Sequence, residues 1–317
     1  MSRRSVGAPL APARALAVCG LLLLAGCSAP GSGDNAGAGP PPAPATAPGS
    51  NRGTASASAS SPVSTPGSGP ASAPGSASAP VAAAPARWQP RPGTPWQWQL
   101  SGTVDTSVQV PVYDIDGFEN GADVVRRLHA AGRKVICYVN VGGWESFRPD
   151  AKDFPAALLG KGDGWPGERW LDIRRTAVLR PLLAARFDMC RAKGFDAVEP
   201  DLADGYANDT GFPLTAGQQL AFNRMVADLA HRRGLAVGLK NDVDQVGELV
   251  DDFDFSVDEQ CAEFDECDAL TPFVAADKAV FHVEYELRTD QFCLDSRRLR
   301  LSSMLKHLSL DAWRRPC

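Results

Sequence analysis

The sequence predicts a (β/α)8 TIM barrel, preceded by a signal peptide and a disordered Ala/Pro/Ser/Gly tether. Three observations carry this prediction. Residues 88–317 have the length of one barrel domain. Apolar, β-branched segments alternate there with helical segments, and a glycine repeatedly separates a helix from the next strand. About eight strand candidates fit into this stretch, as a barrel requires.

The expected strands are short runs rich in β-branched and aromatic residues. In chain order they cover 96–100, 110–115, 134–141, 197–198, 235–239, 253–257 and 279–283. The segments 170–173 and 308–310 are the weaker candidates for completing the ring.

Three helices are expected between these strands, at 121–131, 179–192 and 216–233. Each ends just before a glycine, and Thr215 is a suitable N-cap for the third. A doubly wound sheet is the alternative to a barrel. No glycine-rich phosphate loop follows the first strand, so a nucleotide site has no support.

Residues 1–27 resemble an export signal of the lipoprotein type. Arg3 and Arg4 precede an apolar run, and Leu24-Ala25-Gly26-Cys27 follows it. This order predicts cleavage before Cys27 and lipidation of that residue. A plain secretory signal with an accidental Cys is the alternative. The apolar run is too short for a spanning helix. Ser28 follows the cysteine, which favours the outer membrane, facing the periplasm or the surface, in a Gram-negative host.

Residues 28–87 consist almost only of Ala, Pro, Ser and Gly, which predicts a disordered tether and not a domain. Without residues 1–26 the chain has 29 basic and 37 acidic side chains, a net charge of −8. This charge argues against a nucleic-acid partner and permits a cationic one. We expect a monomer whose contact with the membrane is the lipid anchor alone.

Six cysteines follow Cys27, and an even number in an exported chain indicates disulfides. Cys261 and Cys267 flank a short loop, and Cys293 and Cys317 would tie down the C-terminus. Either Cys137 and Cys190 pair or both are free core thiols. Because the chain has four histidines and no Cys-x-x-Cys, we expect no structural zinc, and we predict no metal or cofactor.

Polar side chains recur at the C-terminal end of strand after strand. In a barrel these ends lie on one face, where active sites are found. A single acidic end would indicate a turn, but a series predicts a shared site. Two further residues, Asp204 and Tyr206, follow one of these ends closely. The strand-end residues are Tyr113, Asp114, Asp116, Tyr138, Asn140, Glu199, Asp201, Lys240, Asn241, Asp258, Glu259, Gln260, Glu284, Tyr285 and Glu286.

Paired carboxylates in one cleft suit acid–base or nucleophilic chemistry on a glycosidic bond. Aromatic rings, which stack on the C–H faces of sugars, lie near the same strand ends. For any single tryptophan, core packing is the alternative. No Gly-x-Ser-x-Gly motif supports an esterase. The aromatic residues are Trp96, Trp98, Trp144, Trp165, Trp170, Tyr138, Tyr206 and Tyr285.

Ten short motifs, in order, resemble glycoside hydrolase family 114, the endo-α-1,4-polygalactosaminidases. They are WQWQLSG, VYDID, VICYVN, WESFRPDA, GWPGERWLDIR, KGFDAVEPD, DGYANDTGF, VGLKND, VDEQC and VFHVEY. The resemblance covers essentially all of residues 96–317.

This resemblance implies a (β/α)8 barrel that cleaves α-1,4-linked, galactosamine-rich polysaccharide inside the chain, with retention of configuration. The family's catalytic Asp and Glu match Asp201 of the Glu-Pro-Asp motif and Glu259 of the Glu-Gln-Cys motif. We interpret Asp201 as the nucleophile and Glu259 as the acid/base. Two departures bear on substrate preference: Leu202 stands where the family carries Asn, and Gly142-Gly143 stands where a Ser is expected before Trp-Glu.

A polymer of de-N-acetylated galactosamine is cationic, and an acidic cleft would attract it. The same acids could bind Ca²⁺ instead, although no Asp-x-Asp-x-Asp-Gly loop is present. A catalytically silent polysaccharide-binding lipoprotein is the other hypothesis, and the presence of both Asp201 and Glu259 favours the enzyme. The predicted substrate contacts are Asp114, Asp116, Tyr138, Asn140, Trp144, Glu199, Asp204, Tyr206, Lys240, Asn241 and Glu284.

Overall fold

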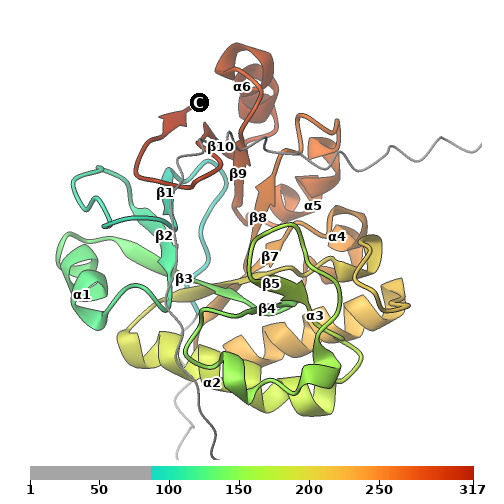
Figure 1. The fold of residues 1–317 in the computed structure, drawn as a ribbon. Coiled ribbons are helices and arrows are strands. Elements are labelled where there is room, and N and C mark those ends of the chain that lie inside the picture. The colour runs from blue at the N-terminus through green and yellow to red at the C-terminus, as the bar shows by residue number, and fades with distance from the viewer. Residues whose placement is uncertain (1–86) are drawn as a thin grey trace, which may run out of the picture. The chain divides into compact units, whose positions relative to one another are not determined.

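The computed structural model describes residues 87–317. The predicted signal peptide, Cys27 and the tether up to residue 86 lie outside the described residues. Parallel strands surround the centre and helices lie around them (Figure 1), which confirms the predicted (β/α)8 barrel. The parallel strands are β1 (Trp96–Gln99), β2 (Val112–Asp116), β3 (Lys134–Asn140), β6 (Ala197–Asp201), β7 (Ala236–Lys240), β8 (Phe255–Glu259), β9 (Val280–Glu284) and β10 (Ser302–Leu305).

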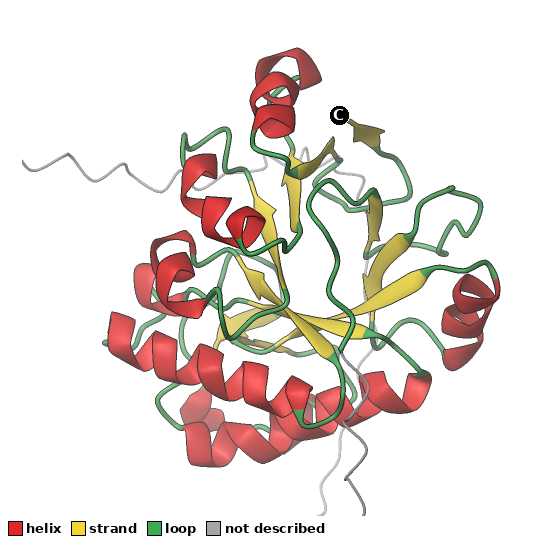
Figure 2. Cartoon of the chain, turned by 180° about the vertical axis from the view of Figure 1, so that it is seen from behind, coloured by secondary structure: helices red, strands yellow, loops and turns green. Residues whose placement is uncertain are grey.

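The three predicted helices are confirmed, and α2 and α3 lie side by side along one side of the barrel (Figure 2). Thr215 caps α3 in a reciprocal capping box with Gln218, and Gly194 ends α2 in a left-handed conformation. In the described part of the chain, no helix has both the length and the apolar character needed to cross a membrane. The α-helices are α1 (Ala122–Ala130), α2 (Thr176–Lys193), α3 (Ala216–His231), α4 (Val246–Leu249), α5 (Thr271–Ala275) and α6 (Thr289–Arg298). Short 3-10 turns are η1 (Ala151–Asp153), η2 (Ala156–Leu158), η3 (Gly205–Ala207), η4 (Val243–Gln245) and η5 (Cys267–Leu270).

The last barrel strand is β10, and neither 170–173 nor 308–310 completes the ring, so both weak candidates were wrong. Trp170 ends β5 (Glu168–Trp170), which pairs antiparallel with β4 (Gly143–Glu145) in a separate hairpin. The β10 segment is short and contains two serines, so its composition does not identify a strand. Pairing with β9 buries it nevertheless, and Ser303 Oγ lies 2.8 Å from His282 Nδ1.

Side chains alternate along each strand, so residues two apart share a face. A small apolar cluster that includes Trp96, Trp98, Phe255 and Phe281 fills the barrel, and a larger cluster packs between the strands and the helices. Gly238 makes room for this filling, because a Cβ atom there would lie 2.4 Å from the Phe255 ring. Near the C-terminal strand ends the same inward positions become polar.

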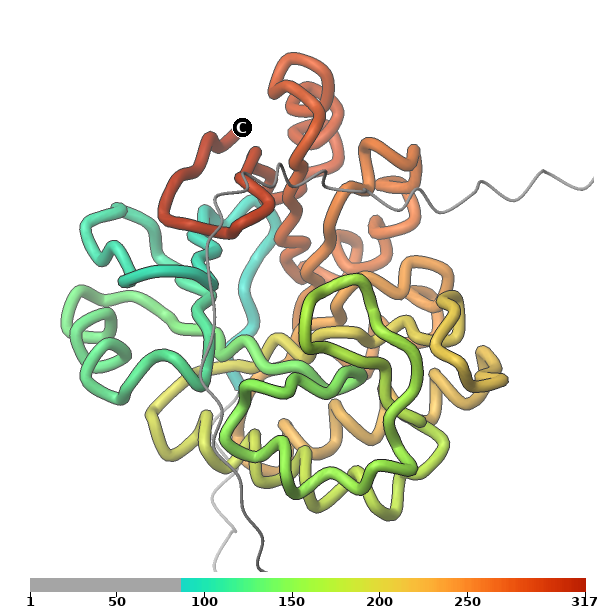
Figure 3. Tube along the Cα trace, in the orientation of Figure 1, coloured from blue at the N-terminus to red at the C-terminus, as the bar shows by residue number. Residues whose placement is uncertain are grey.

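The seam between β1 and β10 is closed by the C-terminal segment. Within residues 87–317 these two strands share no backbone ladder. Instead, Trp96 Nε1 donates to the Ser302 carbonyl at 2.7 Å, and the Leu100 N–H donates to the Leu310 carbonyl at 2.9 Å. The segment curls back beside β1 (Figure 3) and ends in β11 (Arg315–Pro316), antiparallel to β10.

All six cysteines of the barrel are in disulfides. The predicted pairs Cys261–Cys267 and Cys293–Cys317 are confirmed. Cys137 and Cys190, for which the sequence left open a disulfide or two free thiols, form a third disulfide. This bond links β3 to α2.

The chain reaches the barrel at the N-terminal ends of β8 and β9. Trp88 packs against Phe255, with 6.1 Å between the ring centres, and the Pro90 carbonyl accepts from the Ala279 N–H at 2.9 Å. Arg91 pairs with Asp277 beside them. This face lies opposite the strand ends that carry the predicted catalytic residues.

Candidate active site

A cleft of about 320 Å³ opens at the C-terminal ends of the strands and contains both predicted catalytic residues. Asp201 ends β6 and Glu259 ends β8, and β7 lies between these strands in the sheet. Part of the cleft wall is formed by the segment between β3 and α2. The cleft is lined by Trp98, Leu100, Tyr138, Asp163, Trp165, Glu168, Trp170, Asp201, Leu202, Asp204, Asn208, Lys240, Asn241, Glu259, Tyr285, Leu308 and Leu310.

Lys240, the last residue of β7, joins the two carboxylates. Its Nζ lies 3.1 Å from Asp201 Oδ1 and also contacts Glu259 Oε2. Burial opposes the charged form of this lysine, but Asp201, Glu259 and Glu199 together raise its pKa well above the usual value. Burial likewise opposes ionisation of Asp201, yet Lys240 and Tyr138 lower the net pKa of Asp201 below the ordinary value. Asp201 is therefore an anion at neutral pH.

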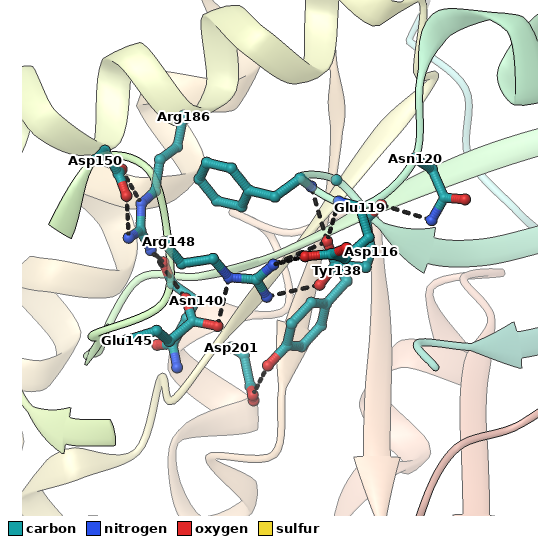
Figure 4. A network of polar contacts seen from close by, with 12 residues as sticks. Asp116, Glu119, Asn120, Tyr138, Asn140, Glu145, Arg148, Asp150, Arg186 and Asp201 are labelled. Carbon is teal, nitrogen blue, oxygen red and sulfur yellow. Dashed lines mark hydrogen bonds and ion pairs between the residues drawn. The ribbon is translucent and has the colours of Figure 1, made fainter. Parts of the chain in front are cut away.

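Two tyrosines hold the other oxygens of this pair. Tyr138 Oη donates to Asp201 Oδ2 at 2.7 Å (Figure 4), and Tyr285 Oη donates to Glu259 Oε1. Burial and the neighbouring carboxylates raise the pKa of both phenols, so both remain protonated donors. Each carboxylate is thereby fixed by one phenol and one shared ammonium.

A buried pair of acids, Asp114 and Glu199, lies one layer below Asp201. Glu199 is two residues before Asp201 and points the same way, but it is 0% exposed and does not line the cleft. Burial and Asp114 raise the pKa of Glu199 well above its usual value, and burial raises the pKa of Asp114 to about 7. The pair therefore holds a proton at neutral pH and cannot contact the substrate directly.

A second lobe of about 430 Å³ continues from the cleft over the loops that follow β7 and β8. It contains Glu259 but not Asp201. The lobe is lined by Trp165, Asp204, Tyr206, Ala207, Asn241, Asp242, Val243, Asp244, Asp258, Glu259, Gln260, Phe264, Glu266, Tyr285 and Leu308.

Five of the predicted substrate contacts line these two spaces: Tyr138, Asp204, Tyr206, Lys240 and Asn241. Asp204 lies where the lobes meet, and burial raises its pKa above the ordinary value.

Asp116 lies instead in a buried ionic network outside the cleft (Figure 4). Its carboxylate accepts from Arg148 Nη1 at 3.0 Å and Nη2 at 2.6 Å, and from the Phe118 N–H at 2.8 Å. Arg148 Nε also donates to Glu145 at 2.8 Å. Asp116 is thus a structural residue, because its acceptor positions face this arginine and the following turn.

Asn140, Trp144 and Glu284 do not line the cleft either. Asn140 Oδ1 accepts from the Gly143 N–H at 2.6 Å, and Trp144 Nε1 donates to the Ala151 carbonyl at 2.9 Å. Glu284 is buried against His282 and accepts from the Ala262 N–H at 2.8 Å. All three shape the loops around the site.

The prediction of substrate contacts from sequence missed several acids that line the site. Asp163 and Glu168 belong to the segment around β5, and burial raises the pKa of Glu168 to about 7. Asp242 and Asp258 line the second lobe. Asp242 could have been predicted, because it directly follows Asn241, which the sequence places at a strand end. No feature of the neighbouring sequence marks Asp163 as a site residue.

The two departures from the family motifs contact each other. Leu202 has a φ of 58°, a left-handed conformation that Asn adopts more easily than Leu. A Cβ atom on Gly142 would lie 1.8 Å from the Leu202 carbonyl oxygen, and one on Gly143 would lie 2.6 Å from Leu202 Cδ1. Gly142 therefore makes room for the backbone at position 202, and Gly143 makes room for the Leu202 side chain.

Among the described residues, Cys261, Cys267 and His282 are close enough to share a metal ion. Both sulfurs belong to one disulfide, so neither is a free thiolate ligand.

The family model of glycoside hydrolase family GH114 matches residues 77–317. None of the curated protein sequences matches this chain. The crystal structure of Aspergillus fumigatus Ega3 in complex with galactosamine is 38% identical, covers 74% of this chain and 99% of its own, and superposes with a TM-score of 0.69. The glycoside hydrolase domain of PelA from Pseudomonas aeruginosa is 13% identical over 70% of this chain and 98% of its own, with a TM-score of 0.55, and shares the fold. The chain belongs to glycoside hydrolase family GH114.

Proposed function

We propose that this glycoside hydrolase cleaves α-1,4-linked galactosamine polymers within the chain, with Asp201 as nucleophile and Glu259 as acid/base. The observation that carries the proposal is the pair of carboxylates that share Lys240 at the floor of an open, acidic cleft. The similarity to Ega3, whose structure holds galactosamine, supports the substrate class. A cleft open along two lobes suits a polymer that binds by its interior.

In the first step, the Asp201 carboxylate attacks the anomeric carbon and forms a glycosyl ester, while Glu259 gives its proton to the departing oxygen. In the second step, Glu259 takes a proton from water, and the resulting hydroxide attacks the same carbon and frees Asp201. Tyr138 keeps one oxygen of Asp201 in place through both steps. Because Lys240 contacts Glu259 as well as Asp201, it has to turn towards Asp201 before Glu259 can act as an acid.

Retention of configuration is part of this proposal. Two carboxylates that contact one ammonium have their nearest oxygens within two hydrogen-bond lengths, roughly 6 Å. Retaining glycosidases hold their carboxyl groups about 5–5.5 Å apart, and inverting enzymes about 6.5–9.5 Å apart. Proton NMR of the first-formed product anomer checks this: an initial α-anomer supports retention, and an initial β-anomer contradicts it.

The test of function is digestion of deacetylated and fully acetylated galactosaminogalactan by the purified protein, with product sizes measured by mass spectrometry. We expect internal cleavage of the deacetylated polymer and loss of at least about 10⁴-fold in rate for Asp201→Asn. Glu259→Gln should also lose activity and recover part of it with azide or a good leaving group. Glu199→Gln should retain most activity, and the exposed Asp209→Asn is the matched control. Full binding without cleavage by the wild type would favour a silent binding protein instead.

We also propose that the enzyme is exported as a monomer and held in the cell envelope, at the outer membrane, by lipid on Cys27. The lipobox and the Ala/Pro/Ser/Gly composition of residues 28–87 support this location. Cys27→Ser should move the protein from the membrane fraction to the soluble fraction or block its processing. Unchanged fractionation together with unchanged mobility would remove the anchor from the proposal.

A further inference from the structure

The two lobes of the active site differ in which catalytic residue they contain. The first lobe contains Asp201, Lys240 and Glu259, whereas the second contains only Glu259 of these three. A nucleophile must touch the anomeric carbon of the sugar before the scissile bond, and the acid must touch the oxygen that leaves. A space that borders the acid but not the nucleophile therefore lies on the leaving-group side.

The wall of this second lobe is strongly acidic. Besides Glu259 it contains Asp204, Asp242, Asp244, Asp258 and Glu266, and in the described chain no Lys, Arg or His lines it. These acids come from the end of β8 and from the loops after β6, β7 and β8, so the fold gathers them from three separate segments.

Two of these carboxyl groups are buried with unused hydrogen-bonding capacity. Asp258 is 1% exposed, and neither of its oxygens has a hydrogen-bond partner among residues 87–317. Asp242 is 4% exposed, and its Oδ2 accepts from Asn223 Nδ2 at 2.7 Å, but its Oδ1 has no partner in the described part of the chain. Burial raises the pKa of both groups, that of Asp242 to about 8, so both favour the protonated form until a bound cation displaces the proton. Burying such groups without a donor is costly, and a bound cation would offset that cost.

Exposed aromatic side chains complete the lobe. Trp165 is 56% exposed and Phe264 is 62% exposed, and both line it. Phe264 and Glu266 lie on the loop closed by the Cys261–Cys267 disulfide, which holds them beside Glu259. Flat apolar rings beside carboxylates match a sugar that carries an ammonium group, since the rings take its C–H face and the acids its charge.

We infer that the second lobe binds the sugar on the leaving-group side and selects it for a free ammonium group, with Asp242 and Asp258 as its main acceptors. This inference rests on the proposed function. It predicts that the unit directly after each cleaved bond, which becomes the new non-reducing end, is galactosamine and not N-acetylgalactosamine.

The test is cleavage of partially N-acetylated polymer by the full chain in ¹⁸O-labelled water, which marks each new reducing end. Tandem mass spectrometry then identifies the opposite, new non-reducing end. In the wild type we expect the ratio of galactosamine to N-acetylgalactosamine there to exceed the ratio in the polymer by roughly tenfold, the factor expected from a hydrogen bond to a charged group. Asp242→Asn/Asp258→Asn should abolish this preference.

Asp265→Asn is the matched control, because Asp265 lies exposed on the same disulfide-closed loop, does not line the lobe, and has a φ of 58° that Asn adopts easily. It should keep the full preference. If the double variant fails to fold, Glu266→Gln replaces it and should weaken the preference. A wild type without preference at the new non-reducing end, or with preference only at the labelled reducing end, overturns the inference.

Two other results have distinct meanings. Failure of the wild type to cut even the fully deacetylated polymer contradicts the proposed function itself and not only the subsite. Calorimetric titration with CaCl2 covers the alternative cation: micromolar binding that the double variant loses would make the lobe a calcium site and overturn the inference.

Discussion

Replacing Lys240 by methionine should move the acidic limb of the pH–activity profile to higher pH. Asp201 acts as an anion, and its pKa is low although burial alone would raise it. The ammonium 3.1 Å from its Oδ1 is the largest influence that favours ionisation. An opposite charge at this distance lowers a carboxyl pKa by about 1–3 units, so its loss should raise the pKa of Asp201 by a similar amount.

The assay is kcat/KM for the deacetylated polymer between pH 4 and pH 8. Below the new pKa, activity should fall about tenfold per pH unit, so the variant loses more at pH 5 than at pH 8. Lys306→Met is the matched control. Lys306 is also buried, but among the described residues its Nζ donates only to the carbonyls of Asp311 and Trp313, each at 2.7 Å. That variant should lose stability without moving the limb.

The free energy of unfolding of the Lys240→Met variant provides a second test, because the direction of its change with pH can be predicted. A depressed carboxyl pKa contributes stability that is present above the unfolded value, near 3.9, and is lost as pH falls through the folded value. Without Lys240 the site holds uncompensated buried charge, and the cost should reach about 3–5 kcal/mol at pH 7 and shrink towards pH 4. Urea unfolding at both pH values measures it. A folded Lys240→Met variant with an unmoved acidic limb would refute the role of this lysine in ionising Asp201.

Four further predictions concern single changes. Gly142→Ala should lower the free energy of unfolding by at least about 3 kcal/mol in thermal unfolding, because its Cβ would meet the Leu202 carbonyl. The control Gly217→Ala in α3, with open space around it, should be neutral or stabilising. Equal effects of the two variants would contradict the argument. Leu202→Asn should stabilise the fold by about 1 kcal/mol by relieving left-handed strain, and a loss of stability would show that its apolar contacts matter more. Arg148→Met should cost about 3–5 kcal/mol in urea unfolding, since two buried carboxylates lose their partner; a cost below about 1 kcal/mol would show that the network relaxes. Raising NaCl from about 50 mM to about 500 mM should raise KM for the deacetylated polymer but not for a neutral one, and an unchanged KM would remove electrostatics from the account of specificity.

The order of elements could be predicted from the sequence because its signals are local. Apolar runs, the Thr215 cap and the glycines after helices depend on neighbouring residues only. β10 escaped prediction because its burial comes from pairing with β9 and from the His282–Ser303 contact, which are tertiary.

The sequence predicted which face of each strand carries the candidate site residues, but not which of these side chains are exposed in the cleft. Alternation places Glu199 and Asp201 on one face, yet the layer at which the barrel opens decides that Asp201 lines the cleft and Glu199 does not. Similarly, Asp116 looked like a site residue until the structure paired it with Arg148, 32 positions away. Such long-range pairings leave no mark in local sequence.

The way the chain reaches the barrel determines how an attached enzyme would present itself. Trp88 and Pro90 bind at the N-terminal ends of β8 and β9, while the cleft opens at the opposite ends of the same strands. Mechanical load applied at Trp88 and Pro90 would therefore reach β8 at the end remote from Glu259 and leave the mouth of the cleft free of strain.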